Sequence, residues 1–367
     1  MNLTPALKAA YTKDSQSAVE AQKLAHMIAW GPVVFQTARL MIKFGILDML
    51  RDSENGMTEK EIASAANISE YAAKVLLEAS LSTGTVIVNP ETDRYSITKA
   101  GWFLLTDRSV RVNMDFNHDV NYEGWFRLEE SLLEGRPAGL EHFGSWPTVY
   151  EGLSQLPEQV QKSWFGFDHF YSDNSFDEAL RIVFDEHGAR TLLDVGGNTG
   201  RWAMKCTAHC SDARVTIMDL PQQLDMMRAQ TAGKPGADRI DGYGINLLDE
   251  SQSFPSDRHF DAIWMSQFLD CFSEQEILSI LKRSVKAMDG NTRLYIMETF
   301  WDRQKYEAAA MCLTMTSLYF TAIANGNSKM YHSQVMQRLV EEAGMQVEEV
   351  IDNMGRGGHS IMVCKLK

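Results

Sequence analysis

The chain has 367 residues, enough for two domains or one large domain with additions, and enough to bury a sizeable core. Apolar residues make up 44% and charged residues 23%, which excludes disordered, collagen-like and coiled-coil classes. The 35 basic and 49 acidic residues give a net charge of −14, which argues against nucleic acid as the main partner because phosphate binding depends on clustered Lys and Arg.

The beginning of the chain, MNLTPALKAAYTKDSQS, has no continuous apolar stretch, and no run of about 18 apolar residues follows anywhere. We therefore expect a cytoplasmic protein that does not use a membrane. The five cysteines are scattered and odd in number, which is a poor disulfide framework. Cys206 and Cys210 can share a helix face, but only His209 stands beside them, so we expect small apolar residues and no metal site.

The first 105 residues carry the pattern of a winged helix. Helical periodicity covers about 16–50, and Thr58 with Glu61 forms a capping box. Gly84 ends the second helix of a pair that precedes a hairpin. The predicted helix pair and hairpin strands are Glu59–Ala65, Ser69–Ser82, Thr85–Val88 and Arg94–Thr98.

A winged helix can read DNA with its second helix, but the charge of this domain does not support that role. Residues 1–105 hold ten basic and eleven acidic residues, and the second helix sets Lys74 alone against Glu70 and Glu78. We therefore predict a dimerisation module, with a DNA-binding regulator as the alternative.

Residues 106–180 are predicted to be linking helices rich in aromatic residues, which are partly core and partly the wall of a substrate pocket. From 181 to 367 apolar strands alternate with helical segments, which predicts an α/β domain with a doubly wound parallel sheet. The expected strands are Thr191–Val195, Val215–Asp219, Phe260–Met265 and Leu294–Glu298, followed by an antiparallel pair at Met345–Ile351 and Ser360–Leu366.

The strongest motif is the segment DVGGNTG, from Asp194 to Gly200, in which a buried strand runs into a glycine turn that opens a helix. Glycines at this edge of such a sheet let the backbone approach a nucleotide closely. Asp219 ends the next strand, where a carboxylate suits a ribose. The glycines do not have the G-x-G-x-x-G spacing, so a nicotinamide cofactor is the weaker interpretation.

With these motifs, the chain resembles the class I S-adenosylmethionine-dependent small-molecule O-methyltransferases with an N-terminal winged-helix dimerisation domain. The resemblance extends from the helical start through DVGGNTG and MDLP (Met218–Pro221) to LVEEAGM (Leu339–Met345) and the last strand pair. It implies a C-terminal Rossmann-like methyltransferase domain, S-adenosylmethionine as cofactor, and a homodimer.

The resemblance also implies roles for single residues. Asp194 and the glycine loop would hold the methionyl part of the cofactor, and Asp219 with Leu220 the ribose. Asn246 and Leu247 match a Gly-Asp-Phe stretch that contacts adenine, with an amide in place of the usual acid. The complete predicted cofactor set is Asp194, Gly196, Gly197, Gly200, Asp219, Leu220, Asn246, Leu247 and Ser266.

The predicted catalytic residues are Asp270 and Glu298. Asp270 occupies the position at which the family has a His general base, and Glu298 matches the first of two acids that orient that His. The second acid would fall in the segment 326–332, which contains none. Burial can make Asp270 a better base, but an already ionised substrate would need none. A His from elsewhere, His118, His169 or His332, is a third alternative.

The helix from Tyr306 to Ile323, with several Met and aromatic residues, corresponds to the family's substrate-pocket wall and suits a flat aromatic substrate. The predicted function is methyl transfer from S-adenosylmethionine to a hydroxyl of a small aromatic metabolite. The alternative is a family member that binds the cofactor but has lost or redirected methyl transfer, because the His base is missing.

Overall fold

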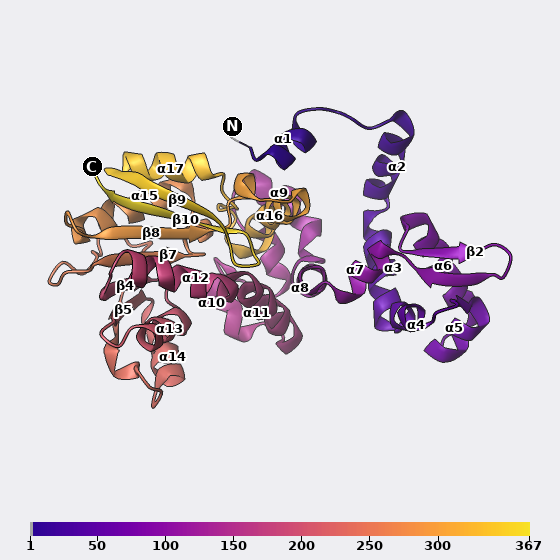
Figure 1. Ribbon diagram of the computed structural model, residues 1–367, viewed down its shortest axis with the longest axis horizontal. Helices are drawn as coiled ribbons and strands as arrows, with labels where there is room; N and C mark the ends of the chain where they lie inside the picture. The colour runs from indigo at the N-terminus through magenta and orange to yellow at the C-terminus, as the bar shows by residue number, and fades with distance from the viewer. Residues whose placement is uncertain (1–2) are drawn as a thin grey trace. The chain divides into compact units, whose positions relative to one another are not determined.

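The computed structural model describes residues 3–367, except for the side chains of residues 172 and 173. The described chain divides into two compact units, one formed by residues 14–120 and the other by the N-terminal segment up to Lys13 together with 121–367 (Figure 1). The domain boundary expected at residue 105 stays a prediction; in the structure α7 (Lys99–Thr106) and α8 (Arg108–Phe116) pack on each other, and both belong to the smaller unit. The predicted linking helices beyond residue 120 belong to the larger unit.

The smaller unit is mainly helical, with a three-stranded sheet of order β1-β3-β2. Its elements are α2 (Ala18–Ala29), α3 (Gly31–Lys43), α4 (Ile46–Asp52), β1 (Met57–Thr58), α5 (Glu59–Ala66), α6 (Glu70–Thr83), β2 (Val86–Asn89), β3 (Arg94–Ile97), α7 (Lys99–Thr106) and α8 (Arg108–Phe116).

Local sequence signals explain the winged-helix part of this unit. The Thr58 side chain accepts a hydrogen bond from the Glu61 N–H and the Glu61 carboxylate accepts one from the Thr58 N–H, as the capping box predicts. The Ser69 hydroxyl caps α6, and Gly84 ends it in the left-handed conformation. The helix pair and hairpin predicted from sequence are confirmed. The short strand β1, which pairs with β3, was not predicted.

The larger unit contains a seven-stranded sheet of order β6-β5-β4-β7-β8-β10-β9, in which only β10 runs antiparallel to its neighbours. The strands are β4 (Thr191–Val195), β5 (Arg214–Asp219), β6 (Ile240–Gly244), β7 (Ala262–Ser266), β8 (Arg293–Glu298), β9 (Met345–Met354) and β10 (His359–Leu366). The predicted doubly wound sheet with a final antiparallel pair is confirmed. The edge strand β6 was missed.

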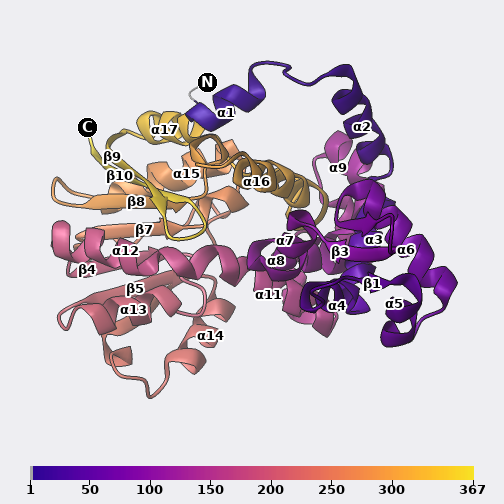
Figure 2. The same cartoon turned by 45° about the vertical axis from the view of Figure 1, so that its right-hand side comes forward.

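Helices cover both faces of this sheet (Figure 2). On one face α15 and α17 pack on an apolar core that includes Ile277 and Leu339, and on the other α12, α13 and α14 pack on a second core that includes Trp202 and Leu224. The helices of the larger unit are α1 (Pro5–Tyr11), α9 (Leu128–Glu134), α10 (Val149–Gly152), α11 (Glu158–Ser172), α12 (Phe176–Leu180), α13 (Arg201–His209), α14 (Pro221–Thr231), α15 (Glu274–Ser284), α16 (Glu307–Tyr319) and α17 (Ser333–Glu342).

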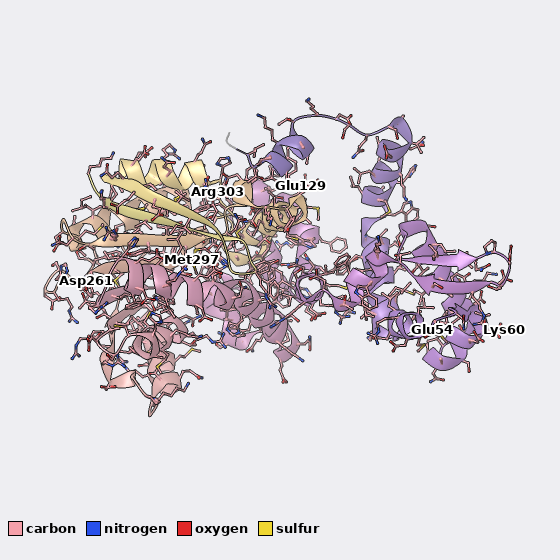
Figure 3. All side chains as sticks on the ribbon, in the orientation of Figure 1. Glu54, Lys60, Glu129, Asp261, Met297 and Arg303 are labelled. Atoms are coloured by element: carbon pink, nitrogen blue, oxygen red, sulfur yellow. The ribbon has the colours of Figure 1, made fainter. Side chains whose placement is uncertain are left out.

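The two ends of the parallel strands differ in role. Asp261, directly before β7, lies at the amino edge, and Met297, near the end of β8, lies toward the carboxyl edge (Figure 3). At the amino edge one oxygen of Asp261 accepts hydrogen bonds from the N–H groups of Arg190 and Thr191, both at 2.8 Å, which ties the start of β4 to that of β7. The carboxyl edge is left for loops that carry the predicted site residues.

One helical stretch, Glu307–Ala324, is long and apolar enough by length and composition to cross a membrane. It consists of α16 and a π-helical continuation, Phe320–Ala324, in which Phe320, Ile323 and Ala324 are buried. Core helices of globular proteins have the same composition, and this one packs against Trp301–Arg303 and α1 within its own unit.

Candidate active site

The glycine loop joins β4 to α13 and brings the backbone close to its neighbours. Gly196 has a φ of +73°, and a Cβ there would lie 2.4 Å from the Phe268 ring. A Cβ on Gly197 would lie 2.6 Å from Oδ2 of Asp194. Gly200 precedes α13 with a φ of +80°. The first two positions thus have no room for a Cβ beside Phe268 and Asp194, and Gly196 and Gly200 adopt a conformation that other residues resist.

Asp194, in β4, is a buried carboxyl group without a protein partner at one oxygen. Asp194 is 2% exposed, and its Oδ2 accepts no hydrogen bond from any group that the structure describes. Burial, with a smaller effect from the charge of Asp219, raises the pKa of Asp194 to about 8. A buried carboxyl beside a glycine cradle is suited to a ligand that brings a positive charge.

Asp219, at the end of β5, faces the same loop. Its Oδ2 accepts the Asn198 N–H at 2.9 Å and its Oδ1 accepts the Leu220 N–H at 2.7 Å. Burial raises the pKa of Asp219, and these two N–H groups act in the opposite direction. Each oxygen keeps a lone pair, so the carboxylate can also accept from two hydroxyls. The two carboxyls and the glycine cradle fit S-adenosylmethionine, which carries an ammonium, a sulfonium and a ribose diol.

A cavity of about 110 Å³ opens beside this loop. Its lining contains four residues of the predicted cofactor set, Asp194, Gly196, Gly197 and Ser266, together with Asn198 and Thr199 of the predicted glycine loop and residues from other elements. The further lining residues are Asp168, His169, Phe176, Asn198, Thr199, Arg201, Trp202, Trp264 and Gln267.

The predicted adenine contacts lie after β6, beyond the residues that line this cavity. The Asn246 side-chain oxygen accepts the Leu248 N–H at 3.0 Å, which leaves it one lone pair. Leu247 packs in the core beneath the sheet, and its carbonyl accepts a hydrogen bond from Arg283. Leu220 is half-buried at the start of α14. The roles of these three residues stay predictions.

Asp270 lies on the short 3₁₀ turn Leu269–Cys271 that follows β7, and its residue is 6% exposed. The Cys271 thiol donates a hydrogen bond to its Oδ1 at 3.6 Å. Burial raises the pKa of Asp270 to about 7, the thiol opposes this effect, and the charge of Asp168 adds to it. Asp270 is therefore a carboxyl group that changes protonation near neutral pH.

Glu298 ends β8 and holds the turn that carries Asp270. Its Oε1 accepts the N–H groups of Phe268 at 3.1 Å and of Leu269 at 2.9 Å. Burial and the neighbouring Asp270 raise the pKa of Glu298 well above its usual range. The predicted pair thus lies together, but Glu298 acts on the backbone of the turn in place of orienting a His.

Aromatic and polar groups surround the Asp270 turn. The Trp164 indole N–H donates to the Tyr319 hydroxyl at 2.7 Å, which links α11 to α16. Asn325 donates to the Cys271 carbonyl at 2.6 Å and holds the turn from the other side. The pKa of Tyr319 is raised by burial, with smaller effects from the charges of Asp168 and Asp270, so these side chains share one region of the larger unit.

The three histidines named as alternative bases have different surroundings. His169 lines the cavity, on α11. His332 caps α17, with Nδ1 accepting the Gln334 N–H at 3.1 Å, and burial lowers its pKa. His118 belongs to the smaller unit, where its Nδ1 lies 2.6 Å from Asp119. Of the two of these histidines that belong to the larger unit, His169 is the one that lines the cavity together with predicted cofactor residues.

Sequence reasoning missed Trp202 and Gln267 as site residues. Trp202 follows the glycine loop within the first turn of α13, and Gln267 follows Ser266 directly. Their positions next to two recognised motif residues were the available signal. No group of three or more His, Cys, Asp or Glu residues gathers as a metal site within the part of the chain that the structure describes.

Comparison with known proteins identifies a family for both parts of the chain. A family model for a Dimerisation2-like domain matches residues 22–95, and one for an O-methyltransferase domain matches 150–346. The chain is 26% identical over 263 residues to 3-amino-4-hydroxybenzoate 4-O-methyltransferase of Streptomyces cremeus, covering 70% of this chain and 67% of that protein. It is 25% identical over 219 residues to bacteriochlorophyllide d C-20 methyltransferase of Chlorobaculum tepidum, covering 59% of this chain and 61% of the relative.

The fold is also that of solved structures. The S-adenosylmethionine-dependent methyltransferase SibL aligns over 93% of this chain and 98% of its own with a TM-score of 0.69, at 21% identity. The predicted family, fold class, cofactor and enzyme class are confirmed by these matches. The chain belongs to the O-methyltransferase domain family, as an S-adenosylmethionine-dependent enzyme with an N-terminal dimerisation domain.

Proposed function

We propose that the protein transfers a methyl group from S-adenosylmethionine to a hydroxyl of a small aromatic metabolite, with Asp270 as the proton acceptor. The observation that carries this proposal is the buried Asp270, whose pKa of about 7 makes it a base near neutral pH, in the unit that holds the glycine cradle. The relative from Streptomyces cremeus has a hydroxybenzoate in its name, which supports an aromatic acceptor.

The residues of the chain divide the work. The bound cofactor supplies an electrophilic methyl on a positively charged sulfur. Asp194 and the glycine loop hold its amino-acid end, and Asp219 its ribose. Ionised Asp270 would take the proton of the substrate hydroxyl, which would leave the oxygen as the nucleophile for the methyl group that the cofactor would supply. Glu298 is a positioning residue, because it fixes the backbone of the Asp270 turn.

Methyl transfer to oxygen is tested with S-adenosylmethionine labelled in its methyl group and a library of phenols. Formation of S-adenosylhomocysteine with a labelled aryl methyl ether is the expected result. If the cofactor binds and no phenol is methylated on oxygen, this proposal is overturned.

A second candidate function is transfer of the methyl group to an aromatic carbon in place of a hydroxyl oxygen. Two observations favour it: the His base is replaced by Asp270, and one relative is named a C-20 methyltransferase. NMR of the labelled product separates the two, since a methyl on oxygen and a methyl on an aromatic carbon differ widely in carbon chemical shift. An aryl C-methyl product would establish this candidate in place of the first.

We further propose that the protein forms a homodimer through its smaller unit. It contains the matched dimerisation domain, and apolar side chains on α2 and α3 are exposed in the single chain. Ile28 is 71% exposed and Trp30 62%, and Val19 and Val33 are also exposed. An exposed apolar face of this kind is typical of a lasting protein interface.

A further inference from the structure

Three residues around the cavity beside the glycine loop each carry a buried polar atom that has no partner among the described residues. Oδ2 of Asp194, Oε1 of Gln267 and Nε1 of Trp202 form no hydrogen bond to any group that the structure describes, and all three residues line this cavity. Burial of such an atom costs free energy unless a ligand or an ordered water replaces the hydrogen bond that it loses, and here three such residues surround one cavity.

The three atoms differ in their hydrogen-bonding role. Asp194 and Gln267 offer acceptors, whereas Trp202 offers a donor. The first turn of α13 adds backbone N–H groups, because Gly200 precedes it without any side-chain cap. A ligand group that donates on one side and accepts on the other fits this arrangement, and a zwitterionic α-amino acid has that pattern.

Local structure holds both new residues in place. The Trp202 ring stacks on Trp264 with ring centroids 4.3 Å apart and an interplanar angle of 17°, which sets the plane of its N–H. Gln267 has a φ of +44°, which is uncommon for a residue with a side chain, and its own N–H donates to the Met297 carbonyl at 2.9 Å. Strain of this kind is kept where the surrounding structure and function require it.

We infer that Gln267 and Trp202 recognise the amino-acid end of the cofactor, Gln267 accepting from its ammonium beside Asp194 and Trp202 donating to its carboxylate. This inference rests on the cofactor position proposed above. Neither residue belongs to the glycine motif or to the predicted cofactor set. Binding through these atoms requires the side chains that cover them to move, because all three atoms are buried in the structure.

Two ligands separate this role from general binding. S-adenosylhomocysteine carries the amino-acid end, whereas 5′-methylthioadenosine has the same nucleoside and sulfur without it. Titration calorimetry of the full chain should give an affinity for S-adenosylhomocysteine that falls about tenfold in Gln267→Met and in Trp202→Phe, with 5′-methylthioadenosine changed less than twofold.

Two matched variants serve as controls. Gln223→Met removes another buried amide oxygen without a described partner, on α14 and outside the cavity lining. Trp301→Phe removes another indole of the larger unit, one that lies outside the cavity lining and packs against His332. Both controls should change the two ligands' affinities in equal proportion. Thermal unfolding of each variant reports whether it folds.

The outcomes are distinct. Equal losses for the two ligands in Gln267→Met would overturn the inference, since they would show a structural role, and so would unchanged affinity for S-adenosylhomocysteine. If Trp202→Phe does not fold, the inference is tested by the titrations of Gln267→Met with the two ligands. Failure of the unaltered protein to bind either ligand would instead overturn the proposed cofactor position.

Discussion

A carboxyl group at position 270 ties the reaction to the protonation of one buried acid. Asp270→Asn removes the proton acceptor and keeps the size of the side chain, so we expect kcat to fall by about 10²–10⁴ with the affinity for S-adenosylhomocysteine retained. In the unaltered enzyme kcat should rise with pH through about 7, where Asp270 ionises. Steady-state rates against pH check both expectations.

The exposed Asp257, before β7, provides the matched control for this substitution. Asp257→Asn removes one exposed carboxyl group and should leave the dependence of kcat on pH unchanged. A substrate that arrives ionised would need no base. Full activity of Asp270→Asn at every pH, with a rate that follows the substrate's own ionisation, would therefore contradict the assigned role.

Asp194 links cofactor binding to the stability of the free protein. Its pKa is about 8 when folded and ~4 in an unfolded chain, so the folded state keeps a proton that the unfolded state has lost. The stability contributed by this group is complete below pH ~4 and is lost as pH rises toward 8. Asp194→Asn cannot ionise, so its unfolding free energy relative to the parent should increase with pH, by at most ~1.4 kcal/mol per unit between 5 and 7.

Denaturant unfolding at pH 5, 6 and 7 without cofactor measures that trend. The same variant should bind S-adenosylhomocysteine more weakly, because an amide offers no charge to an ammonium. In the unaltered protein, binding at pH 7 should release protons, which calorimetry in buffers of different ionisation enthalpy detects. A pH-independent difference in stability would show that Asp194 is already ionised in the free protein.

At the scale of elements, the amino edge of the sheet depends on Asp261. Burial opposes its ionisation, but the N–H groups of Thr191 and Arg190 and the Thr191 hydroxyl lower the pKa of Asp261 below its usual range. Asp261→Ala leaves the two strand-initial N–H groups without their acceptor and should lower the free energy of unfolding by about 2 kcal/mol. Urea unfolding followed by circular dichroism measures this loss.

An exposed pair is the comparison for Asp261. Asp241, on β6, lies 3.0 Å from Arg258 at the surface, and Asp241→Ala should cost less than about 1 kcal/mol. Equal losses in the two variants would mean that the Asp261 hydrogen bonds add nothing beyond a surface ion pair.

Elements with strong local signals could be predicted from the sequence, and those that depend on neighbours could not. The capping box at Thr58 and the left-handed Gly84 are local, so α5 and α6 were predicted nearly to the residue. Strand β6 was missed because Gly242 and Gly244 interrupt it and its residues are only partly buried. In the described sheet β6 is an edge strand beside β5, and the residues of β6 alone do not predict that pairing.

The same division applies to the site. The glycine loop and Asp219 are close in sequence to their strands and could be predicted, as could Asp270 by resemblance. Trp202 and Gln267 come from a helix and a strand end that meet only because β7 pairs with β4 in the sheet. Their lack of hydrogen-bond partners is a property of packing, which no sequence pattern records.

At the scale of the whole molecule, the proposed homodimer makes a prediction about the exposed face of α2. Ile28→Glu places a charge on a side chain that is 71% exposed in the single chain, so a monomer should fold unharmed and the dimer should weaken. Light scattering at micromolar concentration should give twice the 41.4 kDa chain mass for the parent and a lower value for the variant.

The exposed Ser64→Glu on α5 also places one negative charge on a neutral position, away from α2, and controls for net charge. It should leave the measured mass at that of the parent. A parent protein of single-chain mass would contradict the proposed dimer.

The segment before residue 14 contributes to the larger unit although residues 14–120 intervene. The Thr4 hydroxyl donates to the Gln304 carbonyl at 2.9 Å, across 300 positions of the chain, and α1 contacts α16. On a ribosome this partner emerges about 15–60 s after Thr4, at ~5–20 residues per second. The smaller unit is complete long before then, so α1 waits undocked while its neighbour folds. Docking of the first helix therefore belongs to the last steps of biosynthesis, after α16 has left the ribosome.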